Sequence, residues 1–165
     1  ALTGPGRYRL QAGRLWYTWQ YLDEIRRIVK APLLVKGILT VEDALLCIEH
    51  GVDGIVVSNH GGRSMDYGPS TLEVLPEIVA AVKGRLRVLI DSGFRRGSDV
   101  MKALALGADA VLLGRTTRWG LAAFGPAGAQ RVVEIIQREL VDAAASTGRT
   151  TRAAIDQSAI RTRFL

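Results

Sequence analysis

The sequence predicts an α/β fold built on a parallel sheet, and three observations support this prediction. From Pro32 onward, four short apolar runs alternate with longer stretches in which apolar residues recur at helical spacing. The runs are continuously apolar, which is typical of strands buried on both faces. Each run is followed at once by a polar or glycine-rich turn. Strands and helices that alternate at this spacing are joined by right-handed crossovers, which place the strands parallel in one sheet.

The first two units carry clear signals for the helix that follows each strand. The four predicted strands cover residues 33–36, 54–58, 88–91 and 110–113. The first two helices start with an N-cap residue that is followed three positions later by an acidic residue: Thr40 with Asp43, and Ser70 with Glu73. A glycine stands where each of the first three helices should end, at Gly51, Gly84 and Gly107.

The remaining helices are predicted from capping and breaking residues. We expect Ser98 to cap the third helix. The fourth strand leads into a short helical stretch that Gly125-Pro126 breaks, and a longer helix should then continue to about Ala144. Ahead of the first strand, a helical stretch carries apolar residues on one face: Trp16, Trp19, Leu22, Ile25 and Ile28 or Val29.

The position of the polar residues favours a (β/α)8 barrel over an open, doubly wound sheet. Polar and glycine residues follow every strand, and a barrel builds its active site from all of these strand ends. A doubly wound sheet would concentrate its site at one switch point. A barrel needs eight units and about 250 residues, so we expect this chain to form the C-terminal half of one. We interpret residues 1–165 as a single domain with a lead-in at 1–15, a half-barrel at 16–146 and a polar tail at 147–165 that wraps the surface or frays.

Composition excludes several classes of protein. Apolar residues make up 48% and charged residues 23%, as in ordinary globular proteins. The single Cys47 lies in an apolar helical pattern, so we expect a buried, reduced thiol and a cytoplasmic protein. No apolar run approaches the roughly 18 to 20 residues of a membrane span. The net charge is +6, but the arginines are scattered and no aromatic residues interleave them, so we expect phosphate binding and not nucleic-acid binding.

The stretch at residues 58–63 is the most informative. His60 follows a buried strand and stands three residues before Arg63, so one loop offers a proton acceptor and a bidentate partner for a carboxylate. Gly61 and Gly62 allow the backbone to approach a flat ligand closely. A polar turn with a surface histidine remains the alternative interpretation.

Two later loops are candidate anion sites. Residues 91–97 combine glycines and adjacent arginines with a predicted helix start at Ser98. Gly114 and Arg115 follow the next strand, and a barrel commonly holds a phosphate at such a pair of loops. Lys36 would place a positive charge over the site. No group of residues indicates a metal site.

Four motifs resemble, in their order and spacing, those of the FMN-dependent α-hydroxy acid dehydrogenase and oxidase family. They are Lys36-Gly37, Ser58-Asn59-His60-Gly61-Gly62-Arg63, Asp91-Ser92-Gly93-Phe94-Arg95-Arg96-Gly97 and Leu113-Gly114-Arg115. The resemblance covers residues 16–146, and residues 88–125 are most similar to the (S)-mandelate dehydrogenase branch. It implies an FMN enzyme that oxidises an L-2-hydroxy acid, mandelate-like or lactate-like, to the 2-oxo acid.

The resemblance also implies a role for each motif residue. Lys36 would stabilise negative charge at the flavin N1–O2 edge, and Ser58 would contact the flavin ring. His60 would be the catalytic base and Arg63 the clamp for the substrate carboxylate. The ribityl phosphate would be held by the late loops, through Asp91, Ser92, Gly93, Arg95, Gly114 and Arg115.

The sequence departs from the family because nothing in it matches the family's first half-barrel. That half supplies a substrate-binding tyrosine, Gln-x-Tyr flavin contacts and an aspartate that orients the histidine. We therefore expect the isolated chain to bind FMN poorly and to turn over little. Another FMN barrel, such as a type 2 isopentenyl diphosphate isomerase, is disfavoured by the His60–Arg63 pair, because that chemistry has no carboxylate to clamp there. Two alternatives remain open. One is an inactive half-barrel that pairs with a copy of itself or with a complementary half, and the other is weak membrane-surface contact through residues 1–19.

Overall fold

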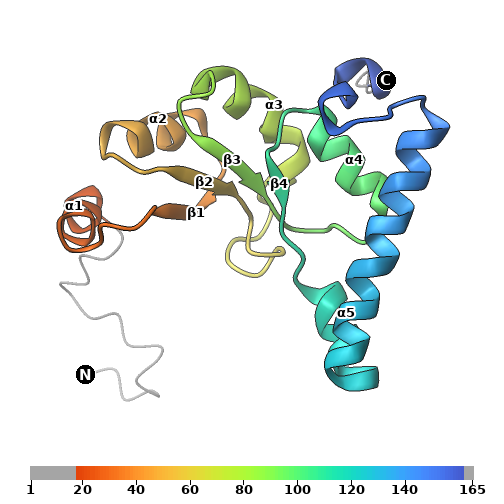
Figure 1. Cartoon of the computed structure of the whole chain (residues 1–165). Helices are drawn as coiled ribbons and strands as arrows, with labels where there is room; N and C mark the ends of the chain where they lie inside the picture. The colour runs from red at the N-terminus through yellow and green to blue at the C-terminus, as the bar shows by residue number, and fades with distance from the viewer. Residues whose placement is uncertain (1–17, 162–165) are drawn as a thin grey trace.

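The computed structural model describes residues 18–161, which form one parallel four-stranded sheet with helices (Figure 1). The strand order is β1-β2-β3-β4, and every neighbouring pair is parallel. The strands are β1 (Leu34–Ile38), β2 (Gly54–Val57), β3 (Arg87–Ile90) and β4 (Ala110–Val111). The helices are α1 (Trp19–Ile28), α2 (Val41–Glu49), α3 (Thr71–Val82), α4 (Gly97–Ala105) and α5 (Arg115–Ser146). The predicted alternation of strands and helices is therefore confirmed.

One face of the sheet carries the hydrophobic core. Side chains alternate across a strand, and Ile55, Val57, Val88 and Ile90 all belong to the core cluster that α2, α3 and α4 complete. Cys47 is fully buried in this cluster, and burial raises the pKa of its thiol to about 11, so the thiol stays protonated. The predicted buried, reduced cysteine fits this environment.

The opposite face of the sheet is only partly covered by the described residues. Leu34 of β1 remains 45% exposed and Leu112, just beyond β4, 38% exposed. All four residues of β2 are buried, whereas β1 alternates between exposed and half-buried positions before its last residue, Ile38, which is buried. The expectation of strands buried on both faces is thus met by the central strand β2 and wrong for the edge strand β1.

The predicted capping signals are confirmed where they are local. Thr40 accepts a hydrogen bond from the Asp43 amide, and Ser70 and Glu73 form a reciprocal capping box. The predicted break in the last helix is also present, because Phe124 and Gly125 have non-helical backbone angles. The Gly120 and Gly128 backbones then pack so closely that neither position has room for a Cβ atom.

The predicted cap of α4 is wrong. The helix begins at Gly97, one residue before Ser98, and its N-cap residue is Arg96. The Asp99 carboxylate accepts hydrogen bonds from the Arg95 and Arg96 amides, at 3.2 and 3.1 Å. A carboxylate at the third helical position therefore replaces the expected serine cap.

All four strands differ from their predicted ranges, β2 by one residue at its end, β3 by one residue at each end, and β1 and β4 by more. β4 contains two residues instead of the four expected at 110–113. β1 continues to Ile38, so Lys36 lies inside the strand and not at its end, and the pairing register shifts between Lys36 and Ile38. Gly37 has φ +108 at this irregularity, a conformation that favours glycine.

The tail wraps the surface, which is one of the two outcomes expected for it. It forms two short 3-10 turns, Arg152–Ala154 and Gln157–Ala159. Arg152 donates a 2.6 Å hydrogen bond to the Asp109 carbonyl, ahead of β4, and Ile160 packs against the core. Among residues 18–161, no helix is long and apolar enough to cross a membrane. The lead-in at 1–15 and Trp16 lie outside the described residues.

Candidate active site

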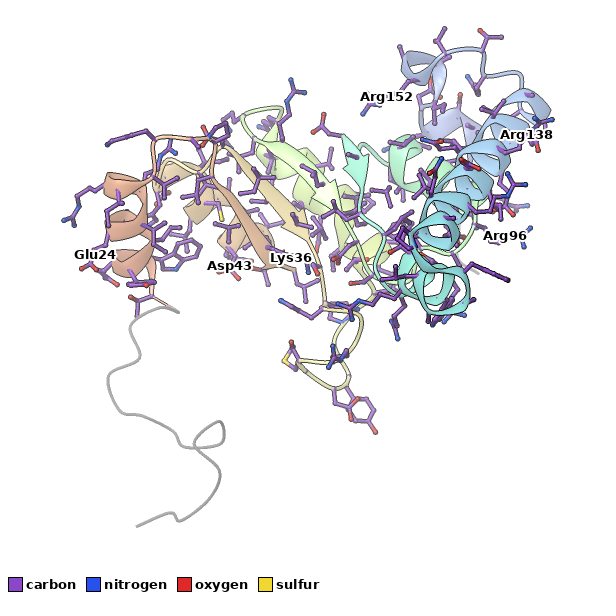
Figure 2. The ribbon with its side chains drawn as sticks, turned by 60° about the horizontal axis from the view of Figure 1, so that its bottom comes forward. Glu24, Lys36, Asp43, Arg96, Arg138 and Arg152 are labelled. Carbon is purple, nitrogen blue, oxygen red and sulfur yellow. The ribbon has the colours of Figure 1, made fainter. Side chains whose placement is uncertain are left out.

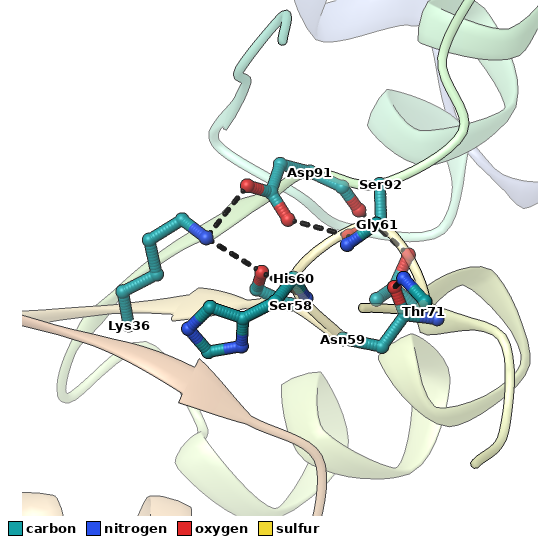
Figure 3. Close-up of polar contacts among 9 residues, drawn as sticks. Lys36, Ser58, Asn59, His60, Gly61, Thr71, Asp91 and Ser92 are labelled. Carbon is teal, nitrogen blue, oxygen red and sulfur yellow. Dashed lines mark hydrogen bonds and ion pairs between the residues drawn. The ribbon is translucent and has the colours of Figure 1, made fainter. Parts of the chain in front are cut away.

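Lys36, in the middle of β1, meets Ser58 and Asp91, which directly follow β2 and β3 (Figure 3). The Lys36 ammonium lies 2.9 Å from an Asp91 carboxylate oxygen and donates a 2.8 Å hydrogen bond to the Ser58 hydroxyl. Figure 2 labels the same lysine near the middle of the molecule, beside the strands of the sheet. Parallel strands bring their carboxyl ends to one edge, so three residues far apart in sequence become neighbours.

The Asp91 carboxyl is held ionised by its surroundings. Burial alone would raise its pKa, but hydrogen bonds from Ser58, Lys36 and Ser92 and the positive charge of Lys36 outweigh burial, and the pKa is lowered. Asp91 and Lys36 therefore form an ion pair at neutral pH. The side chain of Lys36 is 42% exposed and lines the cavity described below.

The loop after β2 presents His60 in an unusual backbone conformation. His60 has φ 57 and is followed by Gly61 and Gly62 with φ 70 and 73, so three successive residues are left-handed. Asn59 stabilises this turn, because its side chain accepts from the Gly62 amide and donates to the Pro69 carbonyl. A non-glycine residue at positive φ is uncommon and is typical of a site where the backbone is constrained for function.

The imidazole of His60 lies against the backbone of Gly37. A Cβ atom at residue 37 would stand 2.8 Å from the ring Cε1 atom, so the glycine of the β1 irregularity leaves room for the ring. His60 is exposed, and among residues 18–161 its imidazole has no hydrogen-bonding partner. A base in an active site is normally oriented by a second group, and the described part of the chain does not provide one.

A cavity of about 780 Å³ opens in front of these residues. Its size is in the range of small-molecule sites. Nine of the ten predicted site residues line it: Lys36, His60, Arg63, Asp91, Ser92, Gly93, Arg95, Gly114 and Arg115. Ser58 does not line the cavity, because it is 1% exposed and lies behind Lys36.

The lining is strongly cationic. Five basic side chains contribute to it, whereas Asp91 is its only acidic residue within the described part of the chain. The basic residues are Lys36, Arg63, Arg95, Arg115 and Arg118. Arg115 donates a 3.1 Å hydrogen bond to the Gly61 carbonyl, and Arg95 lies over the Trp119 ring at 5.6 Å. Such a lining suits a ligand with a phosphate and a second anionic group.

The start of α4 is not the anion site that we predicted. The amides of Arg95 and Arg96 already bind Asp99, and the Gly97 amide donates a 2.8 Å hydrogen bond to Glu139 of α5. Carboxylates of the chain itself therefore satisfy these donors. The arginine side chains and Gly93 of this loop still line the cavity.

The start of α5 has the properties expected of an anion site. Gly114 is its N-cap, and no side chain of residues 18–161 caps the helix. Thr116 lines the cavity, is 7% exposed, and its hydroxyl is buried without a hydrogen-bonding partner among the described residues. A Cβ atom at Gly93 or Gly114 would meet nothing within 4 Å, so both backbones are accessible to a ligand. An oxyanion here would gain the helix terminus and supply the missing partner of Thr116.

The cavity lining also includes residues that the sequence motifs did not indicate, among them Thr116, Arg118 and Trp119. These three follow Gly114-Arg115 on the first turns of α5. Arg118 and Arg115 are three residues apart, a spacing that places both on one helix face, so the sequence could have indicated Arg118 as a second basic residue of the site. Nothing in the sequence indicated that the Thr116 hydroxyl would be buried without a partner.

Comparison with known proteins identifies the family. The family model described as FMN-dependent dehydrogenase matches residues 7–162. A peroxisomal (S)-2-hydroxyacid oxidase of Arabidopsis thaliana is 51% identical over 88% of this chain and 40% of its own length. An L-lactate oxidase of Nostoc sp. is 49% identical over 86% of this chain and 39% of its own length. The chain thus spans about two-fifths of the curated relatives that it matches.

Solved structures agree with this assignment. A mandelate oxidase variant with a monooxide FMN adduct superposes with a TM-score of 0.81 at 46% identity, covering 84% of this chain and 44% of that one. Mandelate oxidase with benzoyl-formic acid superposes with the same TM-score and identity, covering 84% and 41%. The fold is accordingly part of the α/β barrel of these enzymes, and the chain belongs to the FMN-dependent dehydrogenase family.

Proposed function

We propose that this chain forms the FMN phosphate site and the substrate-oxidising residues of an FMN-dependent 2-hydroxy acid oxidoreductase. The observation that carries the proposal is the convergence of Lys36, His60 and Arg63 on one cationic cavity at the strand ends. The substrate would be a small L-2-hydroxy acid, mandelate-like or lactate-like. The named oxidases of lactate, mandelate and (S)-2-hydroxy acids among the relatives support this substrate class.

The phosphate of FMN would bind at the start of α5. Gly93, Gly114 and Thr116 would offer backbone or hydroxyl donors, and Arg95 and Arg115 would supply positive charge. Asp91 and Ser92 lie closer to the strand ends, where the ribityl chain would pass. Ser58, behind Lys36, would act on the flavin ring through the Lys36 ammonium to which it is hydrogen-bonded.

The three residues nearest the substrate would each have a separate role in its oxidation. FMN, when bound, supplies the acceptor for the two electrons of the oxidation. Arg63 would bind the substrate carboxylate in a bidentate manner. His60 would accept one proton, either from Cα or from the hydroxyl, with a hydride leaving Cα in the second case. Lys36 would stabilise the negative charge that develops beside it.

The described residues provide only part of such a site. His60 has no orienting carboxylate among residues 18–161, and one face of the cavity is open. We therefore expect the purified chain to bind FMN weakly and to oxidise mandelate, lactate or glycolate very slowly. Titration with FMN followed by turnover assays tests this. Binding abolished by Arg115→Ala but retained in the exposed-helix control Arg138→Ala would support the site, whereas equal loss in both variants would contradict it.

A second role, self-association, is favoured by the open face of the sheet. Leu34 and Leu112 are exposed there, and β1 and β4 present unpaired edges within the described structure. Such edges favour pairing with another chain, so we propose a homo-oligomer. Light scattering across a concentration series tests this, and a monomer at all concentrations would contradict it.

Two proposals concern the surroundings of the protein. Weak membrane contact through residues 1–19 falls almost wholly outside the described residues, and liposome co-sedimentation with and without residues 1–15 tests it. A cytoplasmic location fits the buried Cys47 thiol, because a reducing compartment preserves free thiols.

A further inference from the structure

Ser92 occupies a backbone conformation that serine rarely adopts. Its φ is 77, in the left-handed region where a Cβ atom makes the conformation unfavourable. Glycine would adopt the same angle without this cost. Among residues 18–161 only three other non-glycine residues have positive φ, and His60 is one of them. The surrounding structure holds Ser92 in this conformation, and the contacts of its side chain are candidates for this restraint.

The Ser92 hydroxyl is hydrogen-bonded on both sides. It donates to one Asp91 carboxylate oxygen at 2.8 Å and accepts from the Gly61 amide at 3.1 Å. The other Asp91 oxygen is paired with Lys36 at 2.9 Å. Ser92 thus connects the Asp91–Lys36 ion pair to the loop that carries the catalytic candidate (Figure 3).

The peptide groups on either side of His60 are each held by a hydroxyl group. Ser58 accepts from the His60 amide at 3.1 Å, and Ser92 accepts from the next amide, that of Gly61. Ser58 is itself bound to Lys36, so the contacts form a closed ring through Asp91, Lys36, Ser58, the backbone amides of His60 and Gly61, and Ser92. The left-handed turn at His60 is therefore fixed from two neighbouring strands.

We propose that Ser92 is a positioning residue: by binding the Gly61 amide it keeps His60 in its left-handed backbone conformation. It transmits the geometry of the Asp91–Lys36 pair to the His60 imidazole. This role differs from direct contact with a cofactor, because the hydroxyl proton and one lone pair are already engaged within the protein. The inference rests on the proposed function only in taking His60 as the base.

The test compares two variants of the purified chain in the absence of FMN. Ser92→Gly removes the hydroxyl and relieves the strained backbone, whereas Ser92→Ala removes the hydroxyl and keeps the strain. Ser98→Ala, at an exposed position in α4, is the control. Amide hydrogen exchange of Gly61 is measured by NMR together with the imidazole carbon signals of His60 and the urea midpoint.

We expect the Gly61 amide to exchange roughly tenfold faster in both Ser92 variants, as the loss of one hydrogen bond implies. The His60 imidazole signals should shift in both, while amides of β2 and the control variant stay unchanged. Exchange within about twofold of the parent in Ser92→Gly would overturn the proposal, because the hydroxyl would then not hold the peptide. Since FMN is absent, failure of the proposed cofactor site would leave this result unaffected.

Discussion

The carboxylate of Glu139, near the end of α5, accepts a 2.8 Å hydrogen bond from the backbone amide of Gly97, at the start of α4. The same side chain pairs with Arg96 at 3.0 Å. Figure 2 shows Arg96 lying against α5. One acidic side chain therefore caps a helix that begins 42 residues earlier in the sequence. Because Glu139 occupies the N-terminus of α4, that terminus is not available to a ligand.

Replacing Glu139 by alanine should destabilise the fold. The variant leaves the Gly97 amide without its acceptor and removes a negative charge from a helix N-terminus, so we expect a loss of about 1–2 kcal/mol. Urea unfolding of Glu139→Ala and Arg96→Ala provides the measurement. The Arg96 side chain is 71% exposed, so its removal should cost less than about 1 kcal/mol. Equal losses in both variants would show that the ion pair matters and the cap does not.

Alanine should destabilise the fold strongly at residue 97 and hardly at all at residue 114. A Cβ atom at Gly97 would overlap the backbone of Glu139 and Leu140, whereas one at Gly114 would meet nothing within 4 Å. We expect Gly97→Ala to cost about 2–3 kcal/mol or more, because α4 and α5 would have to separate. Gly114→Ala should change stability by less than about 1 kcal/mol. Thermal unfolding compares the two, and a tolerated alanine at residue 97 would contradict the close packing.

The unpartnered hydroxyl of Thr116 should lower the stability of the free chain and strengthen the binding of a phosphate ligand. Thr116→Val keeps the shape and removes a buried polar group, so we expect the free chain to be unchanged or more stable by up to about 1 kcal/mol. FMN or inorganic phosphate should bind more weakly to this variant, as titration at low salt would record. Thr117→Val is the matched control, since the Thr117 hydroxyl binds the Gly114 carbonyl. Unchanged phosphate affinity in Thr116→Val would remove Thr116 from the site.

The ionisation of Asp91 should make stability depend on pH in the acid range. Its pKa in the folded chain is below the ordinary value of 3.8, so its contribution is present above that value. The contribution is lost as pH falls through the lowered pKa, because the unfolded chain then binds the proton more readily. The free energy of unfolding of the parent should therefore fall more steeply below about pH 4 than that of Asp91→Asn. Asp66→Asn, in the exposed loop, should follow the parent curve.

Local signals in the sequence predicted the elements and most of the cavity. Thr40 and the Ser70–Glu73 pair act on amides within four residues, and such contacts depend little on the rest of the fold. The loops that follow the strands could be predicted to form the site for a similar reason, since polar residues after parallel buried strands gather at one edge of the sheet. Nine predicted site residues consequently line one cavity.

Long-range contacts explain the predictions that were wrong. Ser98 has the residue type of an N-cap, but Asp99 and the distant Glu139 satisfy the first amides of α4 and move its start to Gly97. β1 extends past Lys36 because Ile38 pairs with Val57 across a register shift. The Glu139 contact and the register shift have no signature in the residues around them, whereas Asp99 acts within four residues and is a local signal.

The sequence by itself determined the β–α repetition, the family motifs and the identity of the residues at the strand ends, because periodicity and capping are local properties. Only the tertiary structure decided that the helix N-terminus facing the cavity is that of α5, and that Ser92 lies between Asp91 and the His60 loop. Both outcomes depend on side chains that meet across 31 and 42 positions of sequence. Packing of the strands and helices creates such contacts, and a linear pattern does not encode them.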